Sequence, residues 1–126
     1  MINVKDLVGV PYKDYGRSKE GLDCYGLAIE VLRRAGKTLP DIFYDSALIE
    51  SKLAIKSTLE SSIPNTVLEK SEEAAIVEIL IVGQPSHCGV CLDNATFIHA
   101  MKQVGVVVEP LYRYNSRIKG FYRVNN

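Results

Sequence analysis

The sequence has no net charge, no long apolar run and no basic leader, and each absence argues against a class of function. Fifteen basic and fifteen acidic residues give a formal net charge of zero, and no basic run indicates a nucleic acid or anionic membrane partner. The longest apolar stretch, residues 74–82, is interrupted by Glu78 and is too short to span a bilayer, so we expect no membrane insertion. The first ten residues show no signal-peptide pattern, which predicts synthesis in the cytoplasm without export by the general secretory path.

The chain also lacks an even set of cysteines, internal repeats and linkers. Three cysteines in a chain without an export signal predict no disulfide framework. No Pro/Gly/Ser-rich or low-complexity segment marks a domain boundary. A length of 126 residues with 47% hydrophobic content suits one core, so we expect a single domain over residues 1–126.

The strongest helical pattern begins at Cys24. Apolar residues recur there at i, i+3, i+4, i+7, i+8 and i+11, namely Cys24, Leu27, Ala28, Val31, Leu32 and Ala35. Asp23 is a suitable N-cap, Gly36 a suitable stop, and two arginines precede the stop, where cations suit the helix dipole. We also expect a short helix after Asn3 that ends at Gly9, a polar loop over 12–21 and a second helix within 45–60.

After Glu73 the periodicity changes to that of strands. Short β-branched or apolar segments follow one another, separated by turn residues, at 75–82, 87–93, 96–100, 104–111 and 118–124. A helical first half followed by such strands predicts an α+β fold, with N-terminal helices packed on a C-terminal antiparallel β-sheet.

Cys24 is the first candidate for chemistry. A thiol in the first turn of a helix lies where the backbone N–H groups and the dipole favour the thiolate. The neighbouring carboxylate of Asp23 opposes that charge, so a nucleophilic Cys24 needs an imidazole partner. The alternative is a small apolar residue that fills the start of the helix, because free cysteine is commonly buried.

The chain has only two histidines, His87 and His99, twelve positions apart on neighbouring predicted strands. A loop of three or five residues between the strands would put them on one face, and with three residues His99 lies opposite Gly89; a two-residue loop would send His99 to the other face. On one face, one ring can take the proton from Cys24 and the other can orient it, as in cysteine hydrolases. Alternatively, both are ordinary hydrogen-bonded residues.

Two further interpretations involve the neighbouring cysteines. Cys88, Cys91 and His99 could ligate zinc, since Cys-x-x-Cys is a ligand spacing, but an odd separation on a strand sends the two cysteines to opposite faces. A redox dithiol would need the first cysteine at a helix N-terminus, whereas the following residues indicate a turn and a strand. We therefore expect no metal and no redox role.

Two blocks of the sequence together resemble a known family. Residues 7–40 contain a Pro-Tyr pair and the element Asp-Cys-x-Gly-Leu, and residues 86–124 contain His-x-Gly-Val and Phe-Ile-His-Ala. This combination resembles the NlpC-type cell-wall cysteine peptidases, which are papain-like. The stretches GLDCYGL, GKTLPD and IKGFYRV resemble the branch associated with phage and prophage tails. The chain departs from the pattern where relatives usually carry Gly-Asp before the first sheet strand, and at Cys88 and Cys91.

The resemblance implies a role for each candidate residue. Cys24 corresponds to the nucleophile, His87 to the base and His99 to the residue that orients the base. Tyr12 matches a tyrosine whose hydroxyl lies near the nucleophile, although a loop aromatic packed on the core would look the same. Asp23 matches an aspartate that contacts the free amine of the substrate peptide in some relatives, a role compatible with N-capping.

The resemblance also implies an activity and a setting. We expect a cysteine peptidase of peptidoglycan stem peptides that cleaves the γ-D-glutamyl–diaminopimelate bond without a cofactor. It would be made in the bacterial cytoplasm, be carried with phage tail proteins and act at the cell wall. The alternatives are a phage tail assembly or structural protein that needs no catalysis, and an amidase or acyltransferase for another γ-glutamyl or acyl substrate. Oligomeric state and host wall chemistry stay open.

Overall fold

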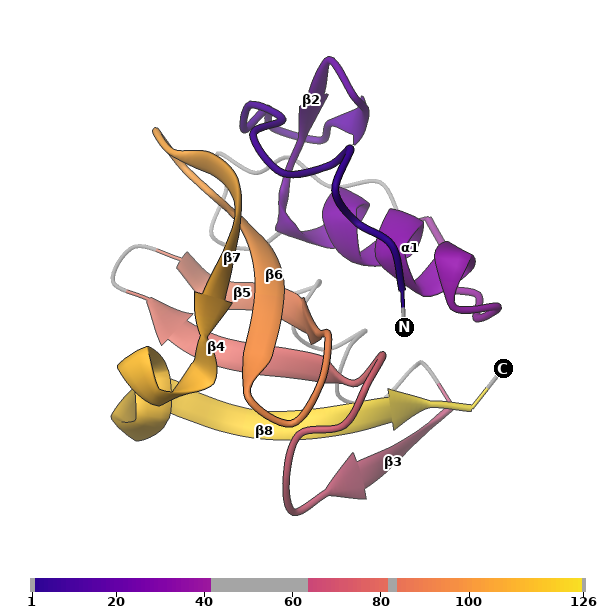
Figure 1. The fold of residues 1–126 in the computed structure, drawn as a ribbon, viewed down its shortest axis with the longest axis vertical. Coiled ribbons are helices and arrows are strands. Elements are labelled where there is room, and N and C mark those ends of the chain that lie inside the picture. The colour runs from indigo at the N-terminus through magenta and orange to yellow at the C-terminus, as the bar shows by residue number, and fades with distance from the viewer. Residues whose placement is uncertain (1, 42–63, 82–83, 126) are drawn as a thin grey trace.

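Residues 2–41, 64–81 and 84–125 are described in the computed structural model of the chain, and Figure 1 shows how they are arranged. A small hairpin, β1 (Arg17–Ser18) and β2 (Gly21–Leu22), precedes helix α1 (Cys24–Arg34). A six-stranded antiparallel sheet follows, in the spatial order β3-β8-β4-β5-β6-β7. Its strands are β3 (Asn65–Leu68), β4 (Ile76–Ile81), β5 (Gln84–Cys91), β6 (Thr96–Met101), β7 (Gly105–Pro110) and β8 (Ile118–Val124), and a 3₁₀ helix, η2 (Leu111–Arg117), connects β7 to β8. The predicted α+β fold is confirmed.

Helix α1 forms where the apolar periodicity predicts it. The Asp23 side chain accepts a hydrogen bond from the backbone N–H of Gly26 at 2.7 Å, which satisfies one of the free donors of the first turn. Arg33 and Arg34 occupy the last turn, and Gly36 ends the helix with a φ of +79°. The buried face packs against β5 and β6 and consists of Tyr25, Gly26, Leu27, Ala28, Val31 and Leu32.

The sheet buries both of its faces, because apolar side chains point alternately to two clusters. One cluster lies between the sheet and α1 and includes Cys88, Val90 and Ile98. The other lies on the opposite face beside η2 and includes Val77, Cys91 and Phe97. Cys88 and Cys91 therefore point to opposite faces, as their odd spacing predicts.

The β5–β6 hairpin has the register that the histidine hypothesis requires. Val90 pairs with Ile98 and Cys91 with Phe97, and the N–H of Leu92 donates to the carbonyl of Thr96 at 2.9 Å. The loop is therefore Asp93–Ala95, and Asp93 closes it by accepting hydrogen bonds from two backbone N–H groups at the loop's end. Extended by one position, this register puts His99 opposite Gly89 and on the same face as His87. The prediction of an odd-numbered loop is confirmed.

Gly89 lets β6 approach β5 closely, because a side chain at this position would collide with β6. A Cβ at this position would lie 2.7 Å from the Ile98 carbonyl oxygen, 2.8 Å from the Phe97 ring and 3.0 Å from the Cβ of His99. Gly89→Ala should therefore destabilise the fold by about 1–3 kcal/mol through overpacking. Thermal unfolding measures this, with Gly120→Ala as the matched control, because its nearest contact is the hydroxyl end of a tyrosine side chain. Equal melting temperatures for the two variants would contradict the prediction.

Some expectations about the first half of the chain are wrong. Residues 5–9 form turns, not a helix, because Gly9 (φ +91°) donates its N–H to Val106 of β7 and Val10 accepts one from Val106, so β7 takes the backbone groups a helix would use. Part of the loop expected over 12–21 is the β1–β2 hairpin, and β3 and η2 are additional elements. The helix expected within 45–60 falls outside the described residues. No helix in the described part of the chain has the length and apolarity to cross a membrane.

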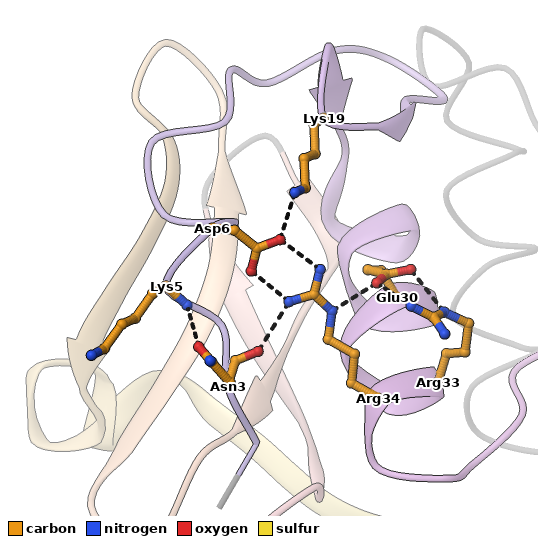
Figure 2. Close-up of polar contacts among 7 residues, drawn as sticks. All are labelled: Asn3, Lys5, Asp6, Lys19, Glu30, Arg33 and Arg34. Atoms are coloured by element: carbon orange, nitrogen blue, oxygen red, sulfur yellow. Dashed lines mark hydrogen bonds and ion pairs between the residues drawn. The ribbon is translucent and has the colours of Figure 1, made fainter.

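A polar network fastens the N-terminal segment to α1 and the hairpin (Figure 2). Arg34 makes a bidentate contact with Asp6 at 2.6 and 2.9 Å, reaches the Asn3 carbonyl at 3.0 Å and bonds Glu30 at 2.7 Å. Lys19 from the hairpin completes the cluster with a contact to Asp6 at 2.8 Å. The Arg34 and Lys19 hydrogen bonds hold the pKa of Asp6 well below its usual range. The network fixes the course of the chain toward Tyr12.

Candidate active site

Cys24 is the first residue of α1, and its side chain is only partly buried. Its carbonyl oxygen lies 3.8 Å from the thiol of Cys88 on β5. The start of the helix therefore meets the strand that carries His87 and Cys88. The thiol thus lies in the first turn of the helix, as the sequence predicts.

The surroundings of Cys24 favour its thiolate. A hydrogen bond with Cys88 lowers the pKa of the Cys24 thiol, burial raises it, and the proximity and charge of His87 lower it again, so that the pKa lies well below its ordinary value. The same contact raises the pKa of Cys88, with burial adding to the effect. His87 is thus one of the groups that favour the charged form of Cys24.

His87 and His99 are in direct contact inside the protein. The Nε2 of His87 lies 2.8 Å from the Nδ1 of His99, and both side chains are fully buried or nearly so. The Nδ1 of His87 has no hydrogen-bond partner among the described residues. One nitrogen of the His87 ring is therefore held by His99, and the other is the one available to Cys24.

The far side of His99 meets an acidic residue that sequence reasoning did not identify. The Nε2 of His99 lies 2.6 Å from the Oε2 of Glu109 on β7. Phe97 pairs with Glu109 and His99 with Val107, so Glu109 projects from the same sheet face as His99. The alternation of β7 could have indicated this face, but nothing in the sequence ties Glu109 to His99 specifically.

Tyr12 reaches the same neighbourhood from the N-terminal segment. It forms an isolated bridge with Leu22 and is half-buried against the α1 side of the core. Burial raises the pKa of the Tyr12 hydroxyl, and the negative charges of Cys24 and Asp23 raise it further. Tyr12 thus stays protonated and lies within electrostatic reach of Cys24.

Asp23 is buried, and its carboxylate accepts hydrogen bonds from neighbouring groups of the protein. Besides capping α1, it accepts the N–H of Tyr15 at 3.0 Å and a hydrogen bond from Arg17 at 3.0 Å. The guanidinium of Arg17 also bonds Asp41 at 3.0 Å and stacks on the Tyr15 ring. An amine from a substrate would therefore share Asp23 with Arg17.

The structure connects all five residues singled out in the sequence. Tyr12, Asp23 and Cys24 lie at the start of α1, His87 acts on Cys24, and His99 joins the group through its contact with His87. Among the described residues, no group of three or more His, Cys, Asp or Glu side chains is placed to hold a metal ion. The arrangement is a thiol, two imidazoles in series and a terminal carboxylate, which suits nucleophilic attack with proton transfer.

Selective alkylation tests whether the pKa of Cys24 lies below the pKa values of Cys88 and Cys91. Iodoacetamide at neutral pH should modify Cys24 at least about tenfold faster than either other cysteine, because reactivity follows the thiolate. Burial raises the pKa of Cys91 to about 11, and the contact with Cys24 together with burial raises the pKa of Cys88. Peptide mapping by mass spectrometry over a time course measures the three rates. Equal rates, or faster labelling of Cys88, would contradict the activation of Cys24.

Comparisons with known proteins agree with this picture. Residues 9–119 match the NlpC/P60 family. A solved structure of the NlpC/p60 domain of the peptidoglycan hydrolase SagA is similar, with 18% identity and a TM-score of 0.61 over 95% of this chain and 90% of that one. A protein similar to lipoprotein, of the NLP/P60 family, from Staphylococcus aureus subsp. aureus Mu50 has 21% identity and a TM-score of 0.59 over 94% of this chain, which spans 37% of that protein. No curated protein matches the sequence.

Proposed function

The chain belongs to the NlpC/P60 family, and on that premise we propose that it is a cysteine peptidase that hydrolyses amide bonds in peptidoglycan stem peptides. The observation that carries the proposal is the series of groups from Cys24 through His87 to His99 at the start of α1. A thiol with a lowered pKa, a base with one free ring nitrogen and a second ring that holds the base are the parts that thiol-dependent hydrolysis needs.

The reaction proceeds through a covalent intermediate. The thiolate of Cys24 attacks the carbonyl carbon of the scissile amide, and His87 holds the proton that the thiol has given up. His87 then donates this proton to the departing amine, so the C–N bond breaks and a thioester forms on Cys24. A water molecule, deprotonated by His87, hydrolyses the thioester and restores the thiol. The N–H of Cys24, in the first turn of α1, and the hydroxyl of Tyr12 are the proposed donors to the oxyanion.

The proposed target within the stem peptide is the γ-D-glutamyl–diaminopimelate bond. SagA, whose domain is similar in fold, is described as a peptidoglycan hydrolase. Asp23 is the proposed contact for the free amine of the peptide, and this contact has to be made beside Arg17, which shares the carboxylate. An amine would gain less there than at an unpaired carboxylate, which favours substrates bound through several contacts.

The proposed setting is a phage or prophage tail, with the protein made in the bacterial cytoplasm and acting at the cell wall. The support is the resemblance of the stretches around Cys24, Pro40 and Phe121 to the tail-associated branch. A tail component that needs no catalysis is the main alternative, and a transferase acting on another acyl substrate is the second.

Digestion of purified wall material tests the activity and its target. The protein is incubated with sacculi and with free stem peptides, and the products are identified by mass spectrometry. For free stem peptides the proposal predicts L-alanyl-D-glutamate and fragments that begin with diaminopimelate. For sacculi it predicts fragments that begin with diaminopimelate, while L-alanyl-D-glutamate stays on the glycan. Cleavage at another bond would correct the target, whereas intact sacculi and intact peptides would contradict the peptidase and favour the tail component.

A further inference from the structure

The series of hydrogen bonds at the site does not end at His99. The carboxylate of Glu109 lies 2.6 Å from the outer nitrogen of the His99 ring and also accepts the Tyr114 hydroxyl at 2.7 Å. Its side chain is 17% exposed, whereas that of His99 is fully buried. Glu109 is thus the last link between the buried rings and solvent.

The charges of these groups settle which ring nitrogens carry protons. Burial raises the pKa of Glu109, but the hydrogen bonds from Tyr114 and His99 lower it, and the net pKa is below its ordinary value. Glu109 is therefore a carboxylate at neutral pH and can only accept, so the Nε2 of His99 must donate. Burial and the charge of His87 lower the pKa of His99 to about 4, which leaves His99 neutral with an acceptor at Nδ1.

The tautomer of His87 follows from that of His99. Since the Nδ1 of His99 is an acceptor, the Nε2 of His87, at 2.8 Å, must carry a proton and donate it. In a neutral His87 the lone pair is then on Nδ1, the buried nitrogen without a partner among the described residues. This is the nitrogen that the proposed mechanism uses to take the proton from Cys24. Each bond in the series thus fixes the tautomer of the next ring.

We propose that Glu109 is a positioning residue that, through the ring of His99, holds His87 in the tautomer and orientation needed to accept the proton of Cys24. The inference rests on the proposed roles of Cys24 and His87. It also assigns an electrostatic task to the carboxylate, because a negative charge at the end of the series stabilises the positive charge that arises on the rings when the thiolate forms.

The other charged groups around the series are on the same or adjoining elements. Arg113, one turn along η2, lies 3.3 Å from the second oxygen of Glu109 at an exposed position, and Arg117 stacks on the ring of Tyr114. At the opposite end, Cys88 contacts Cys24, and the charges of Asp23 and of Glu78 on β4 act on Cys88. Glu109 contacts the His99 ring directly, so removal of the carboxylate acts on the rings first.

The test replaces Glu109 by its neutral isostere. In Glu109→Gln the midpoint of the pH profile of Cys24 alkylation should move upward by about half to one pH unit, because the thiolate and its charged partner lose the stabilising carboxylate. At neutral pH the alkylation rate should fall roughly three- to tenfold. Glu72→Gln is the matched control, because it removes another carboxylate that pairs with an arginine, here Arg123. It should leave the profile unchanged. An unchanged profile in a Glu109→Gln protein that melts like the parent would overturn the proposal.

A second measurement does not depend on the stability of that variant. The chain has only two histidines, so nitrogen-15 spectra of Cys24→Ser protein labelled at histidine report four ring nitrogens. Both rings should carry their proton on Nε2 at neutral pH, and Glu109→Gln in the same background should give His99 a mixture of tautomers. A proton on the Nδ1 of His99 in the Glu109 protein would overturn the proposal. Neither measurement uses a wall substrate, so failure to cleave peptidoglycan would be recorded separately.

Discussion

Cys24→Ser should abolish peptide cleavage and leave the fold intact, and His87→Ala should do the same. Serine preserves the size of the side chain at the start of α1 but removes the thiolate, and alanine at position 87 removes the base. Each change should lower kcat/KM by roughly 10⁴-fold or more, and the double variant should be no worse than either single one, because nucleophile and base act as a unit. Initial rates on a stem peptide measure the losses, and thermal unfolding checks the fold.

Cys91→Ser is the matched control for the cysteine change. Its side chain is buried on the sheet face opposite Cys88 and takes no part in the proposed reaction. It should keep kcat/KM within a few-fold of the parent. His99→Asn retains a polar partner for His87 and should lose less activity than His87→Ala. A Cys24→Ser protein that cleaves as fast as the parent would remove Cys24 from the mechanism.

Asp23→Ala should cause the largest loss of stability among the site variants. The buried carboxylate accepts hydrogen bonds from Gly26, Tyr15 and Arg17, so alanine leaves a helix end uncapped and a partly buried guanidinium without the buried one of its two anions. Loss of one partner of a buried ion pair costs about 3–5 kcal/mol. For a domain of this size, that corresponds to a melting temperature lower by roughly 10 °C or more.

The Asp41 carboxylate supplies the control for this prediction. It also bonds Arg17 but is half exposed, so Asp41→Asn should change stability by no more than about 0.5 kcal/mol. Asp23→Asn keeps an acceptor for the Gly26 N–H and loses only the charge, so it should lie between the other two. Equal melting temperatures for Asp23→Ala and Asp41→Asn would contradict the prediction that the buried Asp23 carboxylate contributes more to stability than Asp41.

Local patterns were sufficient to predict helix α1 and the β5–β6 hairpin. The helix depends on the apolar period from Leu27 to Leu32 and on its N-cap, which are short-range features of the sequence. The hairpin depends on the three-residue loop closed by Asp93, and the alternation of side chains then put His87 and His99 on one face. Periodicity thus located Cys24, His87 and His99, the loop length stayed a condition until the structure showed three residues, and the roles of Tyr12 and Asp23 came from the family resemblance.

Tertiary pairing decided what the sequence could not predict. Residues 5–9 carry a helical apolar pattern, but β7 takes the hydrogen bonds of Gly9 and Val10, and a segment so short cannot compete. Glu109 meets His99 only because β7 pairs with β6 in one particular register. The β1–β2 hairpin brings Arg17 to Asp23, and no strand pattern in the sequence predicted this hairpin. Contacts of this kind depend on the whole fold.

The most direct test of the account is to trap the covalent intermediate. The protein is mixed with a stem peptide, quenched in acid within the first turnovers and mapped by mass spectrometry. An acyl group with the mass of the N-terminal part of the stem peptide, which ends in γ-glutamyl, is expected on the thiol of Cys24. None is expected in Cys24→Ser. Cleavage that continues in Cys24→Ser, or an acyl group carried by Cys88 or Cys91 instead, would contradict the account.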